Sequence, residues 1–204
     1  MGRVSDAKEK LMDAVFELVW TGSYGTTTID QICERAGVKK GSFYYFFESK
    51  AELAAEAFQE SWKEKRVELD AMFSPTVPPL DRLRKYCDFA FKFQSDIKTK
   101  YGRVLGCPHS CSGSEVCTQE DKLGKTIQGI MDYKLKYLES TVRDAHAQGL
   151  IHAPDAAAKA RMILAYYEGI LTQARIQNDI EILRDTITGI LAILGVKEES
   201  AVTV

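Results

Sequence analysis

The apolar residues of this chain recur with the period of an α-helix almost from end to end, and this pattern restricts the fold more than any other feature of the sequence. Near the start, an amphipathic stripe is formed by Leu11, Ala14, Val15, Leu18 and Val19. Few stretches alternate between apolar and polar residues as a half-buried strand does, and the 5 prolines separate helical stretches. The sequence therefore predicts an all-α fold with about nine helices.

Two capping boxes mark the starts of helices in the first third of the chain. Thr28-Ile-Asp-Gln31 opens a short helix that stops at Gly37, a residue able to take the left-handed conformation of a tight turn. Ser49-Lys-Ala-Glu52 opens a long helix that runs to about Met72. Between these two signals, the aromatic run Phe43–Phe47 predicts a second short helix.

The later helices are expected, in chain order, at Leu80–Ile97, Leu123–His146, Asp155–Ile176 and Ile180–Leu194, with a looser, glycine-bearing stretch from Tyr101 to Thr118. We place a domain boundary at the start of the long helix. This division gives an N-terminal domain of residues 1–49, a second domain of residues 50–196 and a disordered tail of residues 197–204.

The composition narrows the class of protein. Apolar residues make up 45% and charged residues 27% of the chain, which is typical of a globular protein and excludes collagen-like and disordered classes. Without a signal peptide or an apolar run of about eighteen residues, the chain is expected in the cytoplasm with no membrane partner. The formal net charge is −2, so any binding of nucleic acid has to rest on a local site.

A short helix, a glycine-centred turn and a second short helix follow one another at Thr28–Ala36 and Lys39–Phe47. This order is typical of a helix-turn-helix, whose second helix enters the major groove of DNA. The N-terminus of the first helix can meet a phosphate, and the second helix offers positive charge and hydrogen-bond donors. The candidate DNA contacts on these grounds are Thr28, Lys39, Lys40, Ser42, Tyr44 and Lys50.

The stretch Gly25–Leu53 resembles the signature of the tetracycline-repressor-like (TetR) transcription regulators almost end to end. The residues that carry the resemblance are Ala36-Gly37-Val38, Gly41, Tyr44, Phe47, Lys50 and Leu53. The resemblance implies DNA contacts from Thr28, Lys39, Ser42, Tyr44, Tyr45 and Lys50, and a core position for Val38, Phe43 and Phe47. Beyond this stretch, the helices agree with the family only in number and length.

The stretch also departs from the family pattern. Phe46 stands where many members have a histidine that contacts phosphate, and Tyr45 often has a more polar counterpart. Residues 1–50 contain seven basic and seven acidic side chains, so binding is expected to depend on dimerisation more than on charge. The alternative interpretation is a helical pair packed by aromatic side chains, with two solvated lysines.

The resemblance further implies an effector pocket and a dimer. Candidate pocket residues are Tyr86, Phe89, Phe93, Cys107, Cys111, Met131, Tyr137 and Tyr166, with Tyr101, Tyr133 and Tyr167 as further linings. Candidate dimer stripes on the last two helices are Ala160, Ile163, Leu164, Tyr167, Leu171 and Ala174, then Leu183, Ile187, Ile190, Leu191 and Leu194. For both sets the alternative is ordinary packing within one chain.

Three of the five cysteines fall within eleven residues, at Cys107, Cys111 and Cys117. One interpretation is a zinc site that includes His109, although the paired spacing of zinc motifs is absent, and we predict no metal. A second is a reactive sensor thiol at Cys107, because Pro108 suits the first position of a helix whose N-terminus would lower a thiol pKa. A third is small thiols that only fill space.

These observations favour a dimeric repressor that is released from a palindromic operator by a small-molecule or thiol-reactive effector. The alternative is a helical protein that binds a small molecule or metal and has no role on DNA. An enzyme is disfavoured. Cys107 could pair with His109 or His146 as a thiol and a base, but the sequence contains no nucleophile elbow, phosphate loop or carboxylate pair that would support catalysis. We expect no catalytic residue and no cofactor.

Overall fold

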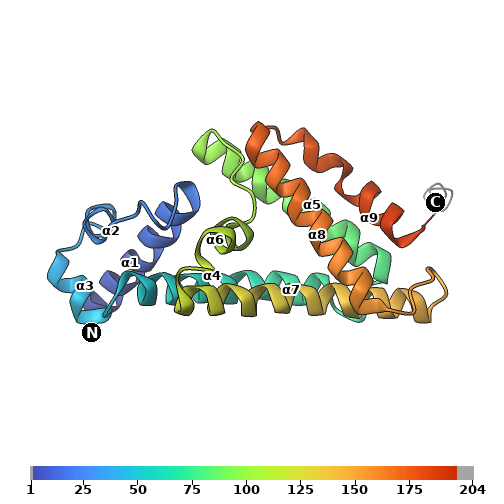
Figure 1. The fold of residues 1–204 in the computed structure, drawn as a ribbon, viewed down its shortest axis with the longest axis horizontal. Helices are drawn as coiled ribbons and strands as arrows, with labels where there is room; N and C mark the ends of the chain where they lie inside the picture. Colours follow the sequence, from blue (N-terminus) through green and yellow to red (C-terminus); the bar gives the residue numbers. More distant parts are fainter. Residues whose placement is uncertain (1, 197–204) are drawn as a thin grey trace. The chain divides into compact units, whose positions relative to one another are not determined.

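The computed structural model describes residues 2–196, so the tail predicted at residues 197–204 lies outside the described residues. Within residues 2–196 the chain forms nine α-helices and one 3₁₀ helix, with no strand, which confirms the all-α prediction (Figure 1). The elements are α1 (Gly2–Thr21), α2 (Ile29–Ala36), α3 (Lys40–Phe46), α4 (Lys50–Met72), α5 (Pro79–Tyr101), α6 (Pro108–Val116), α7 (Asp121–Ala147), α8 (Ala156–Gln177), η1 (Glu181–Asp185) and α9 (Thr186–Leu194).

The helices form two compact units that interleave along the sequence. The first unit contains the described residues up to Arg66 together with Pro108–Met131, and the second contains Val67–Cys107 together with the described residues from Asp132 onwards. The predicted boundary at residue 50 does not coincide with these units, the first of which continues to Arg66. As a division between a DNA-binding and an effector-binding domain, it stays a prediction.

The first unit is built around the amphipathic face of α1. Its buried core includes Leu11, Val15, Ile32, Phe43, Leu53, Phe58, Leu123 and Ile127, which come from α1, α2, α3, α4 and α7. The stripe that the sequence predicts at the start of the chain therefore lies in this core, and Figure 1 shows α1 beside α2 and α3. Burial of these apolar side chains is the main source of the unit's stability.

The second unit is packed around aromatic side chains and one buried guanidinium. The rings of Tyr86 and Tyr167 stack with their centroids 4.4 Å apart. Arg82 is 1% exposed, and its guanidinium contacts the carboxylate of Asp144 at 2.5 Å and the carbonyl oxygen of Val77 at 2.8 Å. These contacts satisfy a charge that would otherwise be costly to bury.

Three details of the predicted helices differ from the structure. The stretch from Tyr101 to Thr118, predicted as loose, contains a helix, α6. Pro108 is its first residue, a position that suits proline. The segment Ile180–Leu194 begins as the 3₁₀ helix η1 before α9, and the side chain of Asp179 accepts a bond from the Glu181 N–H at 3.0 Å. At α4, the carboxylate of Glu52 accepts from the N–H of Glu48 rather than from that of Ser49.

Among residues 2–196, no helix combines the length and the apolar character that a membrane crossing requires.

Candidate nucleic-acid interface

The capping box of α2 has the geometry that the sequence predicts. The Thr28 hydroxyl accepts from the N–H of Gln31 at 3.2 Å, and the Gln31 side chain accepts from the N–H of Thr28 at 2.8 Å. At the other end, Gly37 ends the helix in a left-handed conformation with φ of 66°. These two caps fix the length of α2 and the turn that leads into α3.

Helix α3 separates its aromatic residues between the core and solvent. Phe43 and Phe47, the residue that follows the helix, are 0% and 2% exposed and anchor α3 to the first unit. Tyr44 and Tyr45, in contrast, are 58% and 75% exposed. The Tyr44 ring lies edge-on to Phe43, with centroids 5.1 Å apart, so packing holds the exposed ring in place. The core positions implied for Phe43 and Phe47 are confirmed.

Two exposed lysines stand at the start of α3. Lys39 is its N-cap residue, and Lys40 is its first residue. The Lys40 ammonium contacts the Asp30 carboxylate of α2 at 2.7 Å, and this hydrogen bond raises the pKa of Lys40. Thr28 is exposed as well, and Ser42 is half-buried on α3. The helix therefore presents phenol hydroxyls, an ammonium and a hydroxyl within one short segment.

Lys50, predicted as a DNA contact, lies against the loop between α1 and α2. Its ammonium donates to the carbonyl oxygens of Tyr24 at 2.7 Å and Thr27 at 2.8 Å, and lies 4.0 Å from the centre of the Tyr24 ring. Burial lowers the pKa of Lys50, and the nearby carboxylates of Glu115 and Glu120 oppose that effect. These contacts show that Lys50 holds the α1–α2 loop, and its contact with DNA stays a prediction.

The same loop is held by two carboxylates that the sequence analysis missed. Glu115 of α6 accepts from the consecutive N–H groups of Tyr24 at 2.9 Å and Gly25 at 2.7 Å. The Tyr24 hydroxyl donates to the Glu120 carboxylate at 3.0 Å, and burial, followed by this hydrogen bond, raises the pKa of Tyr24. No local pattern could indicate these contacts, because the partners lie some ninety residues apart in sequence.

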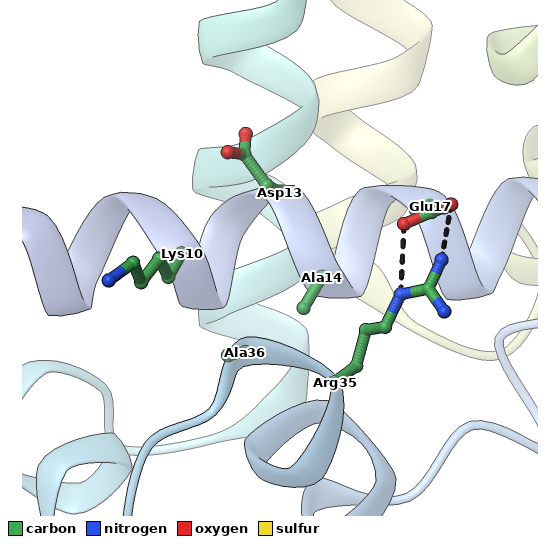
Figure 2. Close-up of a pocket in the computed structure, with 6 residues that line it drawn as sticks. All are labelled: Lys10, Asp13, Ala14, Glu17, Arg35 and Ala36. Carbon is green, nitrogen blue, oxygen red and sulfur yellow. Dashed lines mark hydrogen bonds and ion pairs between the residues drawn. The ribbon is translucent and has the colours of Figure 1, made fainter.

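A surface hollow lies between α1 and α2, lined by Lys10, Asp13, Ala14, Glu17, Arg35 and Ala36 (Figure 2). Across it, the Arg35 guanidinium makes a two-point contact with the Glu17 carboxylate, at 3.1 Å from Nε and 2.5 Å from Nη2. Such bidentate pairs fix orientation as well as distance. This ion pair thus connects α1 and α2 across the hollow.

The predicted effector-pocket residues are divided between the two units. Met131 and Cys111 belong to the first unit, and the other six belong to the second. Within the second unit, Phe89 and Phe93 stack with centroids 6.0 Å apart, Tyr137 stacks on Phe73 at 5.0 Å, and the Tyr166 hydroxyl donates to the carbonyl oxygen of Asp185 at 3.3 Å. Several of these aromatic residues therefore pack in pairs.

Cys107 and Cys117, which lie close in sequence, contact different partners in the structure. The sulfur of Cys107 lies 3.0 Å from the ammonium of Lys134, and that of Cys117 contacts the carbonyl oxygen of Gly124 at 3.9 Å. His109 is buried against the rings of Phe58 and Trp62. None of the five cysteines is in a disulfide. Over residues 2–196 the structure holds no group of three or more His, Cys, Asp or Glu side chains placed to bind a metal.

Comparison with known proteins identifies the family. One family model, described as bacterial regulatory proteins of the tetR family, matches residues 11–57. A second, described as a tetracyclin repressor-like C-terminal domain, matches residues 79–190. An uncharacterized HTH-type transcriptional regulator of Bacillus subtilis (strain 168), YhgD, is 26% identical over 196 residues, which cover 96% of this chain and 98% of the relative.

A further relative and a solved structure with the same fold resemble the chain. The HTH-type transcriptional repressor DhaR of Mycobacterium sp. (strain GP1) is 24% identical over 185 residues, covering 89% of this chain and 88% of the relative. The crystal structure of a TetR-family regulator from Agrobacterium tumefaciens shares the fold with a TM-score of 0.84 at 18% identity, covering 94% of this chain and 99% of the other. The family consists of regulators rather than enzymes. The chain belongs to the TetR family of DNA-binding transcriptional regulators.

Proposed function

We propose that the protein is a dimeric repressor that binds a palindromic operator through α3 and leaves it when an effector binds the rest of the chain. The proposed DNA contacts are Thr28, Lys39, Lys40, Ser42, Tyr44 and Tyr45. The observation that carries this assignment is the exposure of Tyr44 and Tyr45, at 58% and 75%, on a helix whose other face is anchored in the core. Exposed phenols beside lysines suit contacts to phosphates and base edges.

We assign Lys50 a positioning role instead of a DNA contact. Its bonds to the carbonyl oxygens of Tyr24 and Thr27 hold the loop that ends at the N-terminus of α2. That N-terminus, with the exposed Thr28, presents backbone N–H groups and a partial positive charge to a phosphate. The name of DhaR, a repressor, supports repression as the output, and the cytoplasm is the compartment in which such a regulator meets DNA.

The proposed dimer interface is a face of α8 different from the predicted stripe. Of the stripe, Ala160, Ile163, Tyr167, Leu171 and Ala174 are buried within the single chain. The residues left exposed on α8 are Arg161, Met162, Ala165, Gly169, Gln173, Ile176 and Gln177, and five of them, Met162, Ala165, Gly169, Gln173 and Ile176, follow one side of the helix. Apart from Gln173 this side is apolar, with Met162 51% and Ile176 71% exposed. A two-fold pairing of this face would bury it and place two recognition helices on one operator.

The experiment that tests DNA binding is fluorescence anisotropy with the DNA that flanks the protein's own gene. Tyr44→Ala and Lys39→Ala are expected to weaken binding at least about tenfold, and Lys39→Ala is expected to reduce the slope of log affinity against log salt by about one. Tyr133→Ala is the matched control, because Tyr133 is an exposed tyrosine of the second unit.

The result also separates the two functions that the sequence leaves open. Salt-dependent binding that is lost in Tyr44→Ala and kept in Tyr133→Ala supports the regulator. Equal affinity of Tyr44→Ala and the wild-type protein would remove α3 as the recognition helix. Wild-type protein that shows no salt-dependent binding to this DNA would favour a helical binding protein without a role on DNA.

A further inference from the structure

A buried cluster of three ionisable side chains lies within the second unit. The Lys134 ammonium of α7 donates to the sulfur of Cys107 at 3.0 Å and to the Glu168 carboxylate of α8 at 3.0 Å. Cys107, Lys134 and Glu168 are 6%, 8% and 8% exposed. One cation thus bridges two acids in the interior, where charges are retained only with close partners.

The cluster contains an acceptor that the described part of the chain leaves without a partner. Oε1 of Glu168 accepts from Lys134, whereas Oε2 is buried and has no hydrogen-bond partner among residues 2–196. Burying such an oxygen without a donor is costly, and native proteins do so rarely. Oε2 therefore suits a small bound molecule that brings an O–H or N–H donor.

The charge of the cluster favours the reactive form of the thiol. Burial acts to lower the pKa of Lys134, but the negative charges of Cys107 and Glu168 outweigh it, so the pKa lies well above its ordinary value. An ammonium in contact with a sulfur stabilises the thiolate, which is the nucleophile in cysteine chemistry. The same ammonium can protonate a leaving oxygen.

We propose that Cys107, Lys134 and Glu168 form a site that reacts with hydroperoxides, and that oxidation of Cys107 is the signal that controls DNA binding. The Cys107 thiolate attacks the terminal oxygen of H–O–O–R, the S–O bond forms and the O–O bond breaks. The leaving RO⁻ takes a proton from the Lys134 ammonium and departs as ROH. Sulfur loses two electrons to the peroxide and becomes a sulfenic acid, Cys–S–OH.

The geometry favours a hydroperoxide over a large carbon electrophile. All three residues are buried, at 6–8% exposure, so the reagent has to be small. The attacked O–H of a hydroperoxide can donate to Oε2 of Glu168, which supplies the donor that this oxygen lacks. The neighbouring Tyr86 and Tyr167, whose rings stack with centroids 4.4 Å apart, are buried and interact electrostatically with Cys107 and Glu168.

Oxidation changes the charges that hold α7 to α8. The thiolate becomes neutral and Lys134 gives up its proton in the same step, so the bridge between Cys107 and Glu168 loses its attraction. The regulatory half of this inference rests on the proposed repressor function, whereas the reactivity of Cys107 does not.

Reactivity is tested on the reduced full-length protein with hydrogen peroxide, by mass spectrometry that maps sulfenic acid at each cysteine. At pH 7, Cys107 is expected to be oxidised about tenfold faster than Cys111 and Cys117, although both of these are more exposed. The rate at Cys107 is expected to be flat between pH 6 and pH 8, as for a thiol that is already ionised. Oxidation of Cys107 no faster than Cys111, or a rate that rises tenfold per pH unit, would overturn the proposal.

Variants assign the roles within the cluster. Lys134→Met is expected to slow oxidation of Cys107 about tenfold and to move its pH profile upward, whereas Lys134→Arg, which keeps the cation, restores most of the rate. Glu168→Gln is expected to slow oxidation without an upward move of the profile. Thermal melting checks that each variant is folded, and the wild-type pH profile decides the question if Lys134→Met does not fold.

The regulatory half is tested by operator binding before and after peroxide. Peroxide is expected to weaken binding at least about tenfold in the wild-type protein and to leave Cys107→Ser unchanged. Oxidised Cys107 with unaltered DNA affinity, or equal release in Cys107→Ser, would overturn the signalling role. Reduced protein that does not bind the DNA at all contradicts the proposed function instead, and the oxidation rates still test the site.

Discussion

At the scale of single residues, the proposed recognition surface carries a positive charge, Lys40, that is partly neutralised within the protein. The Lys40 ammonium contacts the Asp30 carboxylate at 2.7 Å, and both side chains are exposed. A carboxylate at this position also repels the phosphates that approach α3. If Lys40 contacts DNA as proposed, this ion pair competes with the phosphate for its ammonium.

Asp30→Asn is expected to raise operator affinity about threefold to tenfold and to steepen the salt dependence by about one, because Lys40 becomes available to a phosphate. Anisotropy titrations at several salt concentrations measure both quantities. The matched control is Asp96→Asn, which breaks the similar exposed pair with Lys92 at 3.0 Å. Unchanged or weaker binding of Asp30→Asn would show that Lys40 does not face DNA.

At the scale of helices, local signals predict the helix-turn-helix well, and contacts distant in sequence escape prediction. Thr28 and Gly37 cap α2 as expected, since capping depends on side chains within a few residues. The position and charge of Lys50 predict a DNA contact, but its hydrogen bonds to the carbonyl oxygens of Tyr24 and Thr27 are not indicated by any local spacing.

Glu115 shows how much of the α1–α2 loop depends on such a distant contact. Its carboxylate accepts from the N–H groups of Tyr24 and Gly25, both in the first unit. Glu115→Ala leaves two donors without this acceptor and is expected to destabilise the protein by about 2 kcal/mol, with Glu115→Gln between that variant and the wild type. Urea denaturation measures the difference.

The control for Glu115 is Asp96→Ala, which removes an exposed carboxylate from an ion pair on α5 and is expected to cost less than about 0.5 kcal/mol. Equal stability of Glu115→Ala and Asp96→Ala would mean that water replaces the carboxylate at the loop. The loop would then owe its position to Lys50 and to the bond between the Tyr24 hydroxyl and Glu120.

At the scale of the whole molecule, the sequence does not predict which of the two apolar sides of α8 packs inside the chain and which is left for a partner. Both sides of α8 contain apolar residues, so the helical period fits either as core. The structure buries Ile163 and Leu171 within the chain and leaves Met162 and Ile176 exposed. Periodicity could identify the helix but not the side that remains for a partner, because that depends on how α8 packs on α9 and η1.

The exposed face of α8 gives a direct test of the dimer. Ile176→Asp places a charge where the proposed interface is apolar, and desolvating that charge is expected to raise the dimer dissociation constant at least about tenfold, measured by analytical ultracentrifugation. Val67→Asp is the matched control, because Val67 of α4 is also 71% exposed. Operator affinity is expected to fall in Ile176→Asp alone, since a palindrome requires both subunits. Two variants with the same association would place the interface elsewhere.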